Sequence, residues 1–161
     1  MPSWITAYCP VTIDDVTPES LATLRENDFW TLAEDYGVGD EQVSPALKLF
    51  RIEKSKDGFQ LIYRPAGERQ LAIRCWTSPD RVAEEIAEVK DLPGDSNPPL
   101  IDSIAATRAV VAVELGASQM TDMGIVFAYE VARWLGSHKN ALIKGVDDDW
   151  SRIVDSGFVR L

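Results

Sequence analysis

Hydrophobic and polar residues alternate near the start of the chain, and this pattern predicts a β-strand. In the stretch SWITAYCP, Ile5, Ala7 and Cys9 fall on one side of an extended chain, and the residues between them fall on the other. Pro10 ends the predicted strand, because a proline has no N–H to donate to a neighbouring strand. We therefore expect an opening strand with one apolar face.

Two short helices are expected after this strand. Thr17 followed by Pro18 is typical of a helix start and predicts a helix over residues 17–27. A second helical segment is expected over residues 29–37, which end on a glycine. The acidic stretch that leads from there to Pro45 is expected to be a loop.

Three strand-like runs come next, and they predict an antiparallel meander. They are ALKLFRIEK, FQLIYRP and LAIRCWT, at residues 46–54, 59–65 and 71–77. The short segments SKDG and AGER separate them, and such glycine-containing connections are typical of hairpins.

The clearest helix boundary in the sequence lies at SPDRVAEEIAEVKDL, residues 78–92. Ser78 is suited to the N-cap position and Pro79 to the first turn, while apolar residues recur on one side of the helix. The proline-rich stretch at residues 93–100 is expected to be an ordinary loop and not a hinge between domains.

The last third of the chain predicts a strand, a helix and another strand. The apolar run TRAVVAVEL at residues 107–115 is typical of a central strand that is covered on both faces. A long helix is expected over residues 122–136, and a returning strand over residues 140–146. Together they form a βαβ-like unit whose two strands we expect to be parallel. Residues 147–161 are expected to form a turn and a terminal hairpin.

These elements predict the fold class. We expect one α+β domain over residues 1–161, with a mixed β-sheet, an antiparallel meander, a C-terminal βαβ-like unit, and helices packed on the sheet. A chain of 161 residues with 45% hydrophobic residues can form one substantial core without disulfides or metal.

Charge and targeting signals narrow the possible partners. The formal net charge of −10 opposes contact with nucleic acid, which requires a clustered basic surface.

We expect no insertion into a membrane and no export, because the sequence has no long apolar span and no basic segment followed by an apolar one. Cys9 and Cys75 are expected to be reduced thiols, which favours the cytoplasm.

Glu130 and Arg133 stand out because they lie in a helix that is otherwise almost wholly apolar. Glu130 shares a helix face with Phe127 and other large apolar side chains. Their separation of three residues allows an ion pair within the helix. We expect this pair to be structural, and the alternative is that Glu130 is a functional carboxylate.

A possible ligand site lies near the start of the same helix. Glu114 ends the apolar strand, and Gln119 and Asp122 follow it, so polar groups gather at the carboxyl end of a strand. With Glu130, these residues are the candidates for ligand binding. However, Asp122 is also explained as a favourable charge at a helix start. We expect no cofactor, because the glycine spacing of a phosphate loop is absent.

The acidic run at Asp147, Asp148 and Asp149 is the last candidate. Adjacent carboxylates lack the alternating ligands of a calcium loop, so we expect a solvated turn and no metal site. The functional alternative is that this tip and the neighbouring Trp150 form part of a protein-binding surface.

Residues 110–150, VVAVELGASQMTDMGIVFAYEVARWLGSHKNALIKGVDDDW, resemble a group of small, acidic, uncharacterised bacterial proteins. In its acidity, size and expected sheet, the chain is similar to immunity proteins of bacterial toxin systems. The resemblance implies a cytoplasmic protein that binds and inhibits a protein partner, such as a toxin. The alternatives are a small enzyme or ligand-binding domain that uses Glu114, Asp122 and Glu130, and a structural subunit of a homo-oligomer.

The charge of the chain generates a first testable prediction. The purified protein should not bind duplex DNA at physiological salt, because its net charge of −10 repels phosphate. A fluorescence anisotropy titration measures this directly, and sub-micromolar binding would contradict the prediction.

Overall fold

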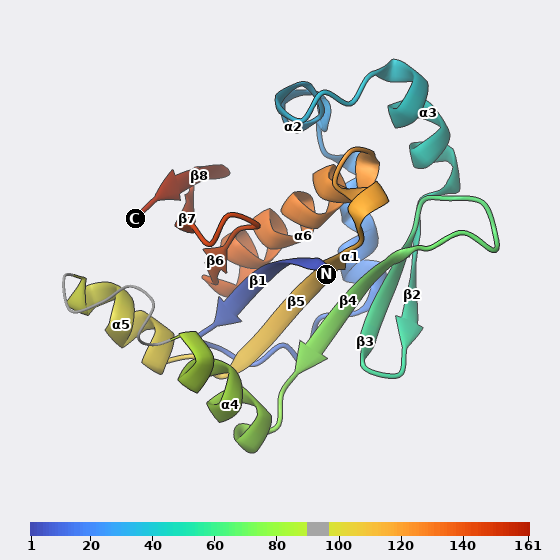
Figure 1. The fold of residues 1–161 in the computed structure, drawn as a ribbon. Helices are drawn as coiled ribbons and strands as arrows, with labels where there is room; N and C mark the ends of the chain where they lie inside the picture. The colour runs from blue at the N-terminus through green and yellow to red at the C-terminus, as the bar shows by residue number, and fades with distance from the viewer. Residues whose placement is uncertain (90–96) are drawn as a thin grey trace.

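The opening strand lies at the centre of an eight-stranded sheet (Figure 1). In the computed structural model, which describes residues 1–89 and 97–161, strand β1 (Ser3–Cys9) pairs with β5 (Ala109–Leu115) and with β6 (Leu142–Lys144). The strand order is β2-β3-β4-β5-β1-β6-β7-β8, and every pairing between these strands is antiparallel.

Both predicted hairpin regions are confirmed. The meander consists of β2 (Arg51–Ser55), β3 (Gly58–Ile62) and β4 (Leu71–Trp76). The terminal hairpin consists of β7 (Trp150–Val154) and β8 (Gly157–Arg160). Strand β5 lies between β4 and β1, which confirms its central position.

The predicted mixed sheet with a parallel βαβ-like unit is wrong. Strands β5 and β6 do run in the same direction, because each is antiparallel to β1, but β1 lies between them. Both edges of β1 are therefore paired, and the two strands that we expected to be neighbours never meet. A pairing over more than 100 residues of sequence has no local signal, which is why the pattern of residues 107–146 could not reveal it.

Helices cover both faces of this sheet. One face carries α1 (Pro18–Ala22), the 3-10 helix η1 (Thr23–Glu26), α2 (Trp30–Asp35), α3 (Asp40–Leu49) and α6 (Met123–Lys139). The other face carries α4 (Pro79–Val89) and α5 (Pro98–Ala105), which lie across the end of the sheet where β1 finishes (Figure 1). A short 3-10 helix, η2 (Ala117–Gln119), precedes α6.

Two helices occupy segments that we expected to be loops, and α3 also takes up residues 46–49, the first part of the strand predicted over residues 46–54. Helix α3 includes Pro45, and the buried side chains Val43 and Ala46 pack it against the main core in spite of the proline. Helix α5 begins inside the expected loop at residues 93–100, where the Asn97 side chain accepts a hydrogen bond from the Leu100 backbone at 3.2 Å. The remainder of that loop, and the end of the helix expected at 78–92, lie outside the described residues.

Helix α6 packs across β1, β5, β6 and β7 and is buried along most of its length. Its close approach to β7 depends on Gly136. A Cβ atom added at Gly136 would overlap Cγ1 of Ile153 and lie only 2.8 Å from its Cβ. The absence of a side chain at this position therefore sets the distance between the helix and the sheet.

Gly136→Ala should destabilise the protein by roughly 1–2 kcal/mol, because overlap with Ile153 outweighs the higher helix propensity of alanine. Urea unfolding measures the change in the free energy of unfolding. Ser137→Ala is the matched control, since Ser137 is exposed on the same helix and should tolerate the change. Equal stability of the Gly136→Ala and wild-type proteins would contradict this account of the packing.

Candidate functional site

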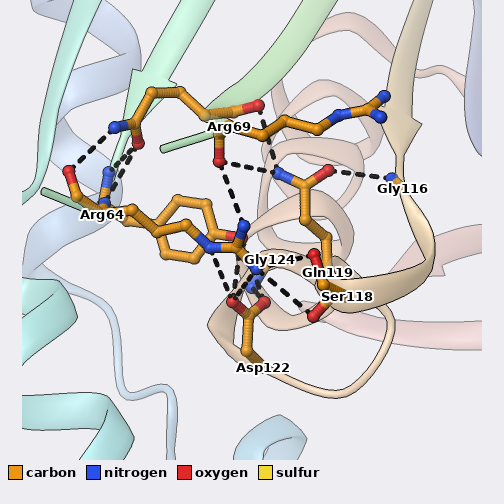
Figure 2. A network of polar contacts seen from close by, with 9 residues as sticks. Arg64, Arg69, Gly116, Ser118, Gln119, Asp122 and Gly124 are labelled. Carbon is orange, nitrogen blue, oxygen red and sulfur yellow. Dashed lines mark hydrogen bonds and ion pairs between the residues drawn. The ribbon is translucent and has the colours of Figure 1, made fainter. Parts of the chain in front are cut away.

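The start of α6 is held by a network of polar contacts around Asp122 (Figure 2). The Asp122 carboxylate caps the helix by accepting a hydrogen bond from the Gly124 backbone N–H at 2.7 Å. It also accepts from Arg64 Nε at 3.0 Å and Nη2 at 2.6 Å, and from the Tyr63 hydroxyl at 3.0 Å. Asp122 therefore joins α6 to the segment that follows β3.

Two other predicted ligand residues, Gln119 and Glu114, contact the segment that links β3 to β4. Gln119 is fully buried, accepts a hydrogen bond from the Gly116 backbone at 2.8 Å and donates one to the Gln70 carbonyl at 3.1 Å. Glu114 forms ion pairs with Arg69 at 3.2 Å and Arg74 at 3.0 Å. The polar groups of Glu114, Gln119 and Asp122 are all bonded within the chain. This cluster therefore holds the start of α6 and the end of β5 against the segment between β3 and β4.

Glu130 lies apart from that cluster, in the buried middle of α6. Its side chain is 0% exposed, accepts a hydrogen bond from Asn27 Nδ2 at 2.8 Å and pairs with Arg133 at 2.7 Å. The predicted ion pair is thus confirmed, while Asn27, which follows η1, had no local signal in the sequence. Burial raises the pKa of Glu130, although Asn27 and Arg133 act in the opposite direction.

The acidic run forms the turn between β6 and β7. Asp147 and Asp148 are exposed, and Asp148 pairs with Lys144 at 2.6 Å. Trp150 does not belong to this exposed tip, which corrects the expectation from the sequence. It is 8% exposed, and its ring lies 5.4 Å from that of Tyr8, because the register of β7 turns it toward the face under α4 and α5. Among the described residues, no acidic, histidine or cysteine cluster is suited to a metal ion.

A groove of about 580 Å³ opens on the sheet face that carries α4 and α5. These helices cover Tyr8 and its neighbours Val110 and Leu142, but the next row of the sheet is left open. The lining residues come from the four strands β1, β4, β5 and β6 and from α4: Trp4, Thr6, Tyr8, Arg74, Trp76, Arg81, Glu85, Glu88, Val89, Ala112, Glu114 and Lys144.

The register of the sheet explains how residues that are distant in sequence form the floor of this groove. Thr6 pairs with Ala112 on β5 and with Lys144 on β6, and Ala112 pairs with Arg74 on β4. The alternation of β1 therefore places Trp4, Thr6 and Tyr8 on the groove side. The sequence predicted the two sides of this strand but gave no indication that one of them lines a groove.

The charged groups of the groove are only partly neutralised. Glu85 pairs with Arg81 at 2.9 Å, and the Arg81 guanidinium lies 4.5 Å from the centre of the Trp76 ring. Glu88, one helical turn further on, is exposed and has no ion-pair partner among the described residues. Burial raises the pKa of Glu85, and the adjacent charge of Glu88 raises it further.

Comparison with protein-family models, curated proteins and solved structures gave no significant match to this chain. Within residues 1–89 and 97–161, no helix has both the length and the hydropathy needed to cross a bilayer.

The buried ion pair generates a prediction about stability. Glu130→Leu should lower the free energy of unfolding by roughly 2–4 kcal/mol, because Arg133 and Asn27 both lose their acceptor. The double variant Glu130→Leu/Arg133→Met should recover much of that loss. Urea unfolding of the full double-mutant cycle tests this expectation. The structural interpretation fails if Glu130→Leu is as stable as the wild type.

Proposed function

We propose that this chain is a cytoplasmic binding protein that neutralises a basic protein partner, as immunity proteins neutralise bacterial toxins. The observation that carries the proposal is the groove, where Glu88, which has no ion-pair partner in residues 1–89 and 97–161, lines the same space as Trp4 and Tyr8. Tyrosine, tryptophan and arginine are the residue types that contribute most energy to protein interfaces.

The groove is better suited to binding than to catalysis. Its lining among the described residues contains no histidine, cysteine or serine, so neither a Ser–His nor a Cys–His pair can be assembled there. The carboxylates near the start of α6 are already bonded within the chain, which removes the main support for an enzyme that uses Glu114, Asp122 and Glu130.

Charge favours a basic partner over a neutral or acidic one. The formal net charge of −10 attracts a basic protein over long range and increases its rate of association. The acidic turn adjoins the groove, because Asp148 pairs with the groove residue Lys144. Asp147, Asp148 and Asp149 would therefore contact the outer part of the same partner.

The test uses the protein encoded by the adjoining gene, expressed with and without this chain. We expect this chain to restore growth of cells that make that protein, and to bind it in calorimetry with an affinity that falls as salt rises. Glu88→Lys should weaken binding by about tenfold or more, because it reverses the charge of the groove wall.

Glu34→Lys is the matched control. Glu34 is exposed on α2, on the opposite face of the sheet, and the substitution changes the net charge by the same amount. It should leave the affinity nearly unchanged. Absence of both binding and growth rescue would contradict the proposed function, and equal losses in both variants would exclude the groove as the contact.

A further inference from the structure

We infer that the groove floor at Thr6 and Tyr8 recognises the guanidinium group of an arginine side chain on the partner. The inference rests on the proposed function and specifies the chemistry that the groove selects.

Two hydroxyl groups that line the groove, and that have no hydrogen-bond partner among the described residues, carry this inference. Thr6 is 8% exposed and Tyr8 is 3% exposed, and both line the groove from the same side of β1. Among the described residues, neither hydroxyl has a hydrogen-bond partner, although Tyr63 and Tyr129, two other buried tyrosines, do have one. Their side chains are largely buried, but neither oxygen is among the buried side-chain atoms that lack a partner, so both remain accessible from the groove to a donor that enters it.

The charge around Tyr8 indicates that the donor is a cation. Burial raises the pKa of Tyr8, and the carboxylates Glu85, Glu88 and Asp148 raise it further, in that order. Three negative charges therefore act on one hydroxyl. Arg81 pairs with Glu85 and Lys144 pairs with Asp148, which leaves Glu88 to supply the counter-charge for a bound cation.

The set of acceptors in the groove, two hydroxyl oxygens and a carboxylate, favours guanidinium over ammonium. A guanidinium group has five N–H donors in one plane, so it can reach two hydroxyl oxygens and a carboxylate together. The chain already contains an arginine bound in a related way, because Arg81 lies over the Trp76 ring and bonds to Glu84 and Glu85 at 2.9 Å each. Aromatic and acidic side chains on this face therefore accommodate a planar cation.

The test titrates the full chain with N-acetyl-arginine amide and follows backbone amide signals by NMR. We expect shifts confined to β1, α4 and the neighbouring strands, with affinity in the millimolar range, as is usual for a single side chain. The citrulline analogue has the same shape but no charge, and it should give no shifts. The lysine analogue should bind more weakly than the arginine analogue.

Tyr8→Phe removes only the hydroxyl and should weaken arginine-amide binding by about fivefold or more. Tyr36→Phe is the control, since Tyr36 packs against Tyr129 on the other face of the sheet. Circular dichroism checks that both variants remain folded. Equal binding of arginine and citrulline analogues, shifts elsewhere on the protein, no binding at all, or full affinity in Tyr8→Phe would each overturn the inference.

The two proposals fail separately. If the adjoining gene product binds and is sensitive to Glu88→Lys, but arginine amide does not bind, the guanidinium site is wrong and the proposed function stands. If arginine amide binds at Tyr8 but the adjoining gene product neither binds nor harms cells, the site stands and the proposed partner is wrong.

Discussion

The burial of α6 is the constraint on which the rest of the structure depends. This helix of 17 residues packs against the sheet and against η1, α2 and α3, so most of its residues are buried. Each polar group on the helix must therefore find a partner inside the protein. Glu130 forms an ion pair with Arg133 and accepts a hydrogen bond from Asn27, which is distant in sequence. Asp122 accepts hydrogen bonds from Arg64 and Tyr63. These contacts connect α6 to η1 and to the meander.

This constraint makes the two faces of the sheet different. On the α6 face, Asp122 is bonded to Arg64 and Tyr63, and Glu130 is bonded to Arg133 and Asn27. On the opposite face, α4 and α5 cover only one end of the sheet, and the groove beside them is lined by Trp4 and Thr6 of β1 and by the exposed Glu88 of α4. Of the ligand residues that the sequence suggested, Glu114 lines this groove, whereas Gln119, Asp122 and Glu130 do not.

The sequence predicted features that depend on neighbouring residues. Alternation located β1, the Ser78 and Pro79 signals located α4, and helical spacing identified the Glu130–Arg133 pair. It did not predict features that depend on distant contacts. The position of β1 between β5 and β6, the burial of Trp150 and the groove itself are all created by sheet register across the whole chain. Helices α3 and α5 were missed because their prolines were interpreted as loop signals.

The place of β1 also affects how the protein is made. The ribosome synthesises this strand before the other seven, yet its two neighbours comprise residues 109–115 and 142–144. The meander can form its local pairings early, whereas β1 has both edges open until residues 109–115 have emerged and one edge open until residues 142–144 have emerged. During that interval it is the segment most exposed to wrong pairing with other nascent chains. A pause in translation before residue 142 would prolong the exposure, and a chain truncated there would leave β1 with one edge permanently open.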